Sequence, residues 1–225
     1  MQQYYSQHPR FYHAVDCIIF GFSGGELNLL LLKRKFDPGK GEWSLMGGFV
    51  REGEHMNDAA KRVLAELTGL TNVFMEQVGS FGQVDRDPGE RVISTAYYAL
   101  ININEYDRNL VEAHNAYWVK VNELPTLLFD HKQMVDRARL VMKVQAAMQP
   151  ISFNLLPEHF TLTQLQTLYE AINGEPIDKR NFRKRVAEMD YIEKTELIDK
   201  VTSRRGAALY KFNIAKYQDS LKFRL

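Results

Sequence analysis

One stretch of 23 residues, 48–70, constrains this chain of 225 residues more than any other part of its sequence. Five residues lie between Gly48 and Glu54, and seven more lie between Glu54 and Arg62. Across 57–68 the apolar residues recur at helical spacing, and the glycine that follows them is a residue type that commonly ends a helix. The sequence therefore predicts a loop, an amphipathic helix and a second loop, in that order.

This spacing resembles the Nudix box, the signature of a family of hydrolases that cleave compounds linked to nucleoside diphosphates. The preceding residues 43–48 also resemble the approach to that box, with Met46 where proline is usual. The resemblance implies the Nudix fold, an α/β/α sandwich, for the N-terminal part of the chain. The positions that match at fixed offsets are Gly48, Glu54, Arg62, Glu66, Gly69 and the apolar pair Leu64 and Leu70.

The departures from the box bear directly on catalysis. In the family's enzymes, glutamates at the offsets of Val63, Glu66 and Leu67 share one helix face and hold divalent cations. Those cations neutralise the diphosphate and activate water. Aliphatic side chains supply no oxygen ligand, so we expect no metal site, no catalytic residues and no hydrolysis. Arg62 and Glu66 are spaced either for an i,i+4 ion pair or for contact with a ligand.

The rest of residues 1–149 has the pattern of a mixed α/β domain. Asp130 is placed to open a helix that runs to about Met148. The strand-like runs lie at 15–22, 27–32, 74–81, 92–103 and 117–121, and the first two are close enough in sequence to form a hairpin.

Composition narrows the class of protein. The chain is 45% hydrophobic, so it has enough apolar residues for real cores. Its single cysteine, Cys17, excludes an internal disulfide or a cysteine-rich zinc site. No apolar stretch approaches the roughly 20 residues needed to span a bilayer, and the first residues lack a secretory pattern. We therefore expect a soluble cytoplasmic protein without a cofactor.

Residues 150–225 differ from the first part in both pattern and charge. Lys and Arg number 16 against 18 acidic residues over 1–150, but 13 against 10 over 151–225. Thr161 is placed to cap one helix and Asp178 a second. Two β-like runs then flank a basic tip. Helix, turn, helix and hairpin predict a C-terminal winged helix-turn-helix domain, and hence an α+β chain overall.

The second of these helices is a candidate for reading DNA. Arginine can pair with guanine and asparagine with adenine, while lysine mostly attracts phosphates. The helix start, where recognition residues reach base edges, would also favour a phosphate. A solvated surface or a protein interface is the alternative. The candidate DNA-binding residues are Lys179, Arg180, Asn181, Arg183 and Lys184 on the helix, with Arg204 and Arg205 at the hairpin tip.

A Nudix fold without metal chemistry keeps a concave pocket between its sheet and the box helix. Carboxylates and cations suit sugar hydroxyls, which both donate and accept hydrogen bonds, and aromatic rings can pack on the apolar face of a sugar. Asp85 and Asp87 alternatively form a turn before Pro88. The candidate effector-binding residues are Lys33, Trp43, Phe49, Arg51, Glu54, Glu66, Asp85 and Arg91.

A Nudix domain stripped of metal ligands and joined to a winged helix resembles the NrtR-type family of Nudix-related transcriptional regulators. Within that family the chain looks closest to the arabinose-responsive AraR type. The resemblance implies a homodimer that represses by binding double-stranded operator DNA and is released by a sugar, L-arabinose. Residues 81–94 are also similar to a segment of Nudix proteins directed at ADP-ribose.

Three alternatives stay open at this point. The same architecture could sense ADP-ribose or a related nucleotide, the chain could be an active Nudix hydrolase, or it could be an RNA-binding or scaffold protein. The aromatic segment 2–13 is placed either at a dimer interface or against DNA.

Overall fold

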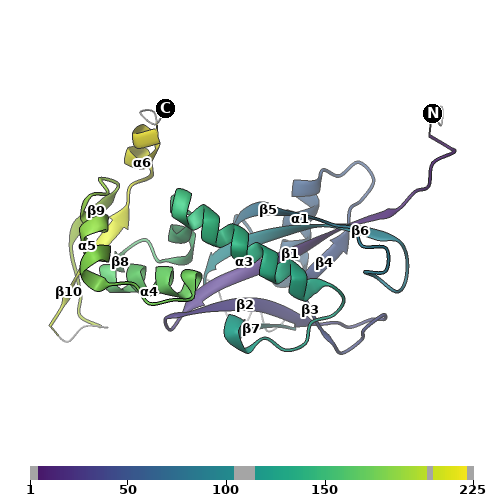
Figure 1. The fold of residues 1–225 in the computed structure, drawn as a ribbon, viewed down its shortest axis with the longest axis horizontal. Helices are drawn as coiled ribbons and strands as arrows, with labels where there is room; N and C mark the ends of the chain where they lie inside the picture. The colour runs from purple at the N-terminus through teal and green to yellow at the C-terminus, as the bar shows by residue number, and fades with distance from the viewer. Residues whose placement is uncertain (1–4, 104–114, 202–204, 222–225) are drawn as a thin grey trace. The chain divides into compact units, whose positions relative to one another are not determined.

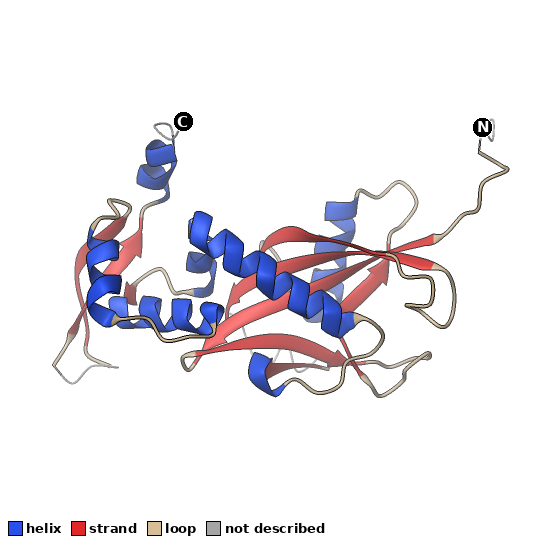
Figure 2. Cartoon of the chain, viewed as in Figure 1, coloured by secondary structure: helices blue, strands red, loops and turns tan. Residues whose placement is uncertain are grey.

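The computed structural model describes residues 5–103, 115–201 and 205–221, and its chain divides into two compact units (Figures 1 and 2). One of its boundaries crosses the helix α3 (His131–Met148), whose residues from Met142 onward belong to the second unit. The sequence-based boundary at 149/150 stays a prediction. The first unit comprises Met1–Phe20, Leu29–Leu100 and Tyr106–Val141, and the second comprises Gly21–Asn28, Ile101–Glu105 and Met142–Leu225.

The larger sheet has seven strands within the described residues. Its main path runs β3-β2-β1-β6-β5, with β4 also paired to β1 and β7 paired to β2. The predicted hairpin of the first two runs is confirmed. The strands are β1 (Tyr12–Ser23), β2 (Glu26–Lys33), β3 (Trp43–Ser44), β4 (Met46–Phe49), β5 (Phe74–Phe81), β6 (Val92–Asn102) and β7 (Ala116–Lys120), followed by the short 3-10 helix η2 (Val121–Glu123).

Neighbouring residues of β1 show that helices cover both faces of this sheet (Figure 1). The Cys17 thiol donates to the carbonyl of Ala60 in α1 (Met56–Thr68) at 3.5 Å. Asp16 lies 3.6 Å from the ring of His131, the first residue of α3. Since successive strand residues point to opposite faces, α1 and α3 lie on opposite sides. The predicted sandwich is confirmed.

This two-sided cover explains the pattern of β1. Its residues from Val15 to Phe20 are all buried, without the alternation of a strand that has one wet face. The box helix ends as predicted, because Gly69 takes a left-handed φ of 74° and donates its backbone N–H to the carbonyl of Ala65. No helix in the part of the chain that the structure describes has the length and apolarity to cross a membrane.

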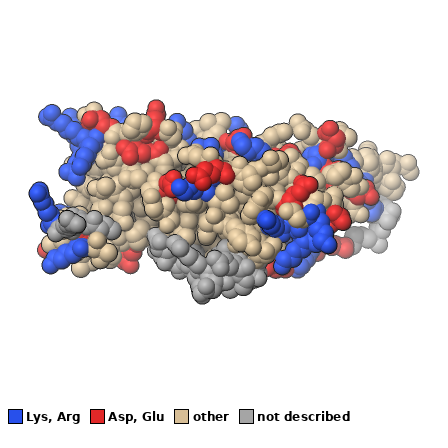
Figure 3. Space-filling model, turned by 90° about the horizontal axis from the view of Figure 1, so that it is seen from below, with Lys and Arg blue, Asp and Glu red and all other residues tan. Residues whose placement is uncertain are grey.

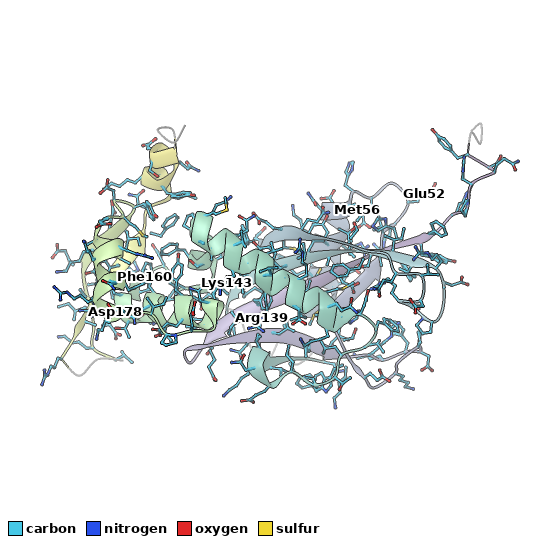
Figure 4. All side chains as sticks on the ribbon, in the orientation of Figure 1. Glu52, Met56, Arg139, Lys143, Phe160 and Asp178 are labelled. Atoms are coloured by element: carbon cyan, nitrogen blue, oxygen red, sulfur yellow. The ribbon has the colours of Figure 1, made fainter. Side chains whose placement is uncertain are left out.

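The second unit contains the predicted winged helix. Its three-stranded sheet runs β8-β10-β9 behind two helices. The elements are η3 (Pro150–Leu155), β8 (Phe160–Thr161), α4 (Leu162–Asn173), α5 (Lys179–Ala187), β9 (Ile192–Asp199), β10 (Ala207–Phe212) and α6 (Ile214–Leu221). Figure 4 labels Phe160 on β8 and Asp178 at the start of α5.

Both helix starts are built as the sequence predicts. The Thr161 hydroxyl accepts from the backbone of Gln164, whose side chain accepts from the Thr161 N–H in return. The Asp178 carboxylate likewise accepts from the N–H of Asn181. The buried residues of α5 are Phe182 and Val186. One face of α5 is therefore fixed against the unit and the others are free for contact.

Candidate functional site

The first unit contains a cavity of about 240 Å³. Strands β1, β2 and β4, the loop after β5 and the start of α3 supply most of its lining. Cations suit phosphates, rings suit planar bases and carboxylates suit sugar hydroxyls. The lining offers all three: the consecutive cations Lys33, Arg34 and Lys35, the rings of Phe36, Phe49 and Phe129, and the carboxylates of Asp16 and Asp87.

A buried ionic cluster, which we call the floor, contributes Asp16, Arg86 and His131 to the lining of this cavity. Arg86 donates to both carboxylate oxygens of Asp130, at 2.9 and 2.8 Å, and its Nη2 lies 3.5 Å from Oδ2 of Asp16. The Ser94 hydroxyl donates to the same Oδ2 at 2.6 Å. Burial alone would lower the pKa of the Arg86 guanidinium, but its bonds to Asp130 and the neighbouring negative charges raise that pKa overall. The charged groups of this cluster are therefore paired with one another.

His131 completes the floor as a neutral ring. Its Nδ1 accepts from the backbone N–H of Leu45 at 3.2 Å, so Nε2 carries the proton and faces Asp16. Burial lowers the pKa of His131, and the positive charges of Arg86 and Arg34 act in the same direction against the two aspartates. The ring consequently fixes the chain at the start of α3 without adding charge to the cavity.

The box helix lacks the geometry of a metal site. Val63, at one glutamate position of the Nudix box, is 2% exposed and lies against Gly48, where a β-carbon would stand 2.8 Å from Val63 Cγ2. Leu67, at another such position, is half-buried and lines the cavity. Among the residues that the structure describes, no three His, Cys, Asp or Glu side chains gather to hold a metal ion. These residues do not fit a divalent cation.

Two arginines donate hydrogen bonds to the carboxylates that the box retains. Arg62 donates to both oxygens of Glu54, at 2.6 and 2.9 Å, to Glu66 at 3.1 Å and to the Phe49 carbonyl at 3.0 Å. Arg51 donates to the other Glu66 oxygen at 3.0 Å. The bonds from Arg62 lower the pKa of Glu54 from 4.5 to about 2, and Glu54 in turn raises the pKa of Arg62. The predicted ion pair of Arg62 with Glu66 is confirmed.

The structure brings only part of the predicted effector set to the cavity. Lys33 and Phe49 line it. Trp43 does not, although the Lys33 ammonium lies 5.0 Å from its ring centre. Asp85 is exposed in the loop after β5, and Arg91 donates to the carbonyls of Gln83 and Gly82. Arg51, Glu54 and Glu66 belong to the arginine network on the box helix instead. Contact of any of the eight predicted residues with an effector stays a prediction.

Sequence reasoning missed the residues of the floor. It took Asp130 for a helix cap, but the Asp130 carboxylate is held by Arg86, and the N–H of Gln133 donates to the Asp130 carbonyl. One signal was available, because Asp16 interrupts an apolar strand and an acid buried there needs a partner. No spacing rule joins it to residues 70 and 114 positions away.

In the second unit, α5 presents the predicted DNA-binding residues to solvent. Lys179, Arg180, Asn181, Arg183 and Lys184 are all exposed. Within the described ranges no carboxylate pairs with the four basic members of this set. In Figure 3, blue basic side chains project from the surface of this unit, with red acidic ones among them. The helix therefore carries unpaired cations on its outer faces.

The wing is the hairpin of β9 and β10. Arg205 is exposed at its tip, whereas Arg204 lies outside the described residues. Next to them, Gly206 has a φ of 78°, and a β-carbon there would stand 2.8 Å from Ile198 Cγ2. Glycine is required at this turn for both reasons.

Comparison with known families agrees with this architecture. Residues 11–138 match the NUDIX domain, and residues 152–212 match the NrtR DNA-binding winged helix domain. A protein of Acinetobacter baylyi described as an ADPR responsive transcriptional repressor, NtrR, is 36% identical over 218 residues, which cover 94% of this chain and 86% of that protein. The chain belongs to the NrtR family. The expectation of an NrtR-type regulator is confirmed, while nothing in these matches points to the AraR type.

Solved structures of the NrtR family are similar over most of the chain. Shewanella oneidensis NrtR complexed with a 27mer DNA has a TM-score of 0.80 and 29% identity, covering 91% of this chain and 95% of that one. The NUDIX domain of the same protein complexed with ADP ribose has a TM-score of 0.54 and 28% identity, covering 62% and 94%. An ADP-ribose pyrophosphatase of Methanocaldococcus jannaschii is 36% identical over 122 residues, or 54% of this chain and 69% of that enzyme.

Proposed function

We propose that this chain is a transcriptional repressor that senses ADP-ribose, or a closely related nucleotide, in its first unit and binds operator DNA through its second. The observation that carries the proposal is the lining of the cavity, where three consecutive cations stand beside aromatic rings and carboxylates. ADP-ribose combines a diphosphate, an aromatic base and ribose hydroxyls, so each of its parts has a matching group.

The same lining disfavours L-arabinose as the effector. Arabinose is uncharged and would leave Lys33, Arg34 and Lys35 without a negative partner. The relatives with a described ligand are also named for ADP-ribose and not for a pentose. The arabinose expectation from the sequence therefore has no support, and the nucleotide alternative replaces it.

We further propose that the first unit binds its ligand without hydrolysing it. Val63 and Leu67 offer no oxygen to a cation, and Arg62 and Arg51 already neutralise Glu54 and Glu66. An active hydrolase is the second candidate function, because the Methanocaldococcus relative is named as a pyrophosphatase. Release of AMP from ADP-ribose with Mg²⁺ or Mn²⁺ separates them. If the wild type releases AMP from ADP-ribose and Glu66→Gln abolishes that release, the chain is a hydrolase.

DNA binding is proposed to run through α5 and the wing. A homodimer would present two α5 helices to successive major grooves, which is how helix-turn-helix proteins read palindromic sites. Size-exclusion chromatography with light scattering tests that dimer. Because coupling is reciprocal, an effector that lowers the affinity of the protein for DNA must bind more weakly, by the same factor, when DNA is bound.

The deciding experiment measures DNA affinity with each candidate effector. The full chain is bound to a fluorescent duplex selected from a random pool, and anisotropy is followed as ADP-ribose or L-arabinose is added. ADP-ribose should release the duplex, and arabinose at the same concentrations should leave the anisotropy unchanged. Release by arabinose alone would reject the nucleotide proposal.

A further inference from the structure

Arg34 differs from Arg86, Arg62 and Arg91 because its guanidinium is not already paired through its terminal nitrogens with any residue that the structure describes. Arg86 is paired with Asp130, Arg62 with Glu54, and Arg91 with two backbone carbonyls. The Nε of Arg34 donates to the Phe36 carbonyl at 3.1 Å. In residues 5–103, 115–201 and 205–221, no acceptor bonds its two terminal nitrogens. A half-buried guanidinium with free donors thus lines the cavity.

Two aromatic rings hold this guanidinium in place. Its central carbon lies 4.2 Å from the ring centre of Phe36 and 5.7 Å from that of Phe129, within the range of cation–π attraction. Phe129 has a φ of 52°, which is uncommon for a bulky residue and marks a site where the surroundings impose the backbone. Arg34 is consequently positioned before any ligand arrives.

We infer that Arg34 binds the diphosphate of the effector and stands in for the divalent cation that Nudix hydrolases place on their box helix. The inference rests on the proposed function, since it concerns the same cavity and ligand. A planar guanidinium bonds two phosphate oxygens at once, and a group that is already held in place loses little side-chain entropy in doing so. Binding of ADP-ribose is then independent of divalent cations.

Titration calorimetry of the full chain with ADP-ribose tests this, in EDTA and in Mg²⁺. The dissociation constant should be the same in both. Arg34→Gln should raise that constant by about 10- to 100-fold, as expected for losing a charge-assisted bidentate contact. The matched control is Arg137→Gln, an exposed arginine of α3 that does not line the cavity, and it should bind as the wild type does.

Two further measurements separate a binding role from a structural one. Thermal unfolding without ligand should give similar midpoints for Arg34→Gln and the wild type. Raising the salt concentration should weaken ADP-ribose binding less in Arg34→Gln than in the wild type, because one ionic contact is missing. Arg34→Lys keeps the charge but loses the planar fork, and should weaken binding by about 10-fold.

The outcomes are distinguishable. If EDTA abolishes binding by the wild type, or if Arg34→Gln and Arg34→Lys bind as tightly as the wild type does, the inference is wrong although the proposed function stands. If the wild type binds no ADP-ribose in either buffer, the proposed function fails first.

Discussion

Both carboxylate oxygens of Asp130 accept hydrogen bonds from one guanidinium, that of Arg86, at 2.8 and 2.9 Å. The two residues come from distant parts of the sequence, one in the loop after β5 and the other directly before α3. Both side chains are almost fully buried, at 3% and 5% exposure. The pair links the loop that carries Asp87, a residue of the cavity lining, to the start of α3.

Removing one partner of this pair should destabilise the first unit strongly. Arg86→Gln leaves two aspartates buried without their cation, and breaking a buried pair in this way costs about 3–5 kcal/mol of unfolding free energy. Urea denaturation of the two variants Arg86→Gln and Arg137→Gln measures the difference, with the exposed Arg137 as the control. A loss below about 1 kcal/mol would mean that the pair adds little.

Introducing glutamate at the two aliphatic positions of the box, one at a time, should lower the free energy of unfolding by unequal amounts. Val63→Glu places a charge at a position that is 2% exposed, and a buried unpaired charge should cost about 3 kcal/mol or more. Leu67→Glu lies at the half-buried edge of the cavity and should cost clearly less. Chemical denaturation of both variants is the measurement. Equal losses would contradict the packing of Val63 against Gly48.

The Glu54–Arg62 bond predicts how stability depends on pH. Because the folded-state pKa of Glu54 is depressed to about 2, its contribution is complete above its ordinary pKa of 4.5 and is lost as the pH falls from there toward 2. The wild type should exceed Glu54→Gln in unfolding free energy at pH 6, and the gap should narrow below pH 4.5. Urea denaturation of both proteins at several pH values between 6 and 3 is the measurement, and a gap that stays constant over that range would contradict the prediction.

Two exposed residues of α5 should affect DNA binding in different ways. Arg183→Ala should relax base preference, because arginine is suited to read guanine. Lys179→Ala should weaken all duplexes alike and reduce the salt slope by about one, as loss of a phosphate contact does. Binding to a panel of duplexes at several salt concentrations checks both. Equal losses on every duplex after Arg183→Ala would contradict its assignment.

The elements of the fold follow from local patterns. The box helix was predictable from its apolar spacing and from Gly69, and both helices of the winged domain from Thr161 and Asp178. Each of these signals lies within a few residues of the structure it specifies. Periodicity and capping act over that same short range, which is why they can be read from a single sequence.

The cavity could not be predicted in the same way. Its floor joins Asp16, Arg86 and Asp130 through contacts between residues that are 44 and 70 positions apart. The role of Arg34 could not be predicted either, because it depends on the rings of Phe36 and Phe129 around its guanidinium. The residues predicted to bind the effector therefore include Lys33 and Phe49, which line the cavity, but neither Arg34 nor any residue of the floor.

The contact of Val63 with Gly48 also has a consequence for engineering. A cation site on this helix takes more than one substitution, because a carboxylate at position 63 alone would be buried without a cation beside it. A design that seeks hydrolysis from this scaffold would have to change positions 63 and 67 together and release Glu66 from its two arginines.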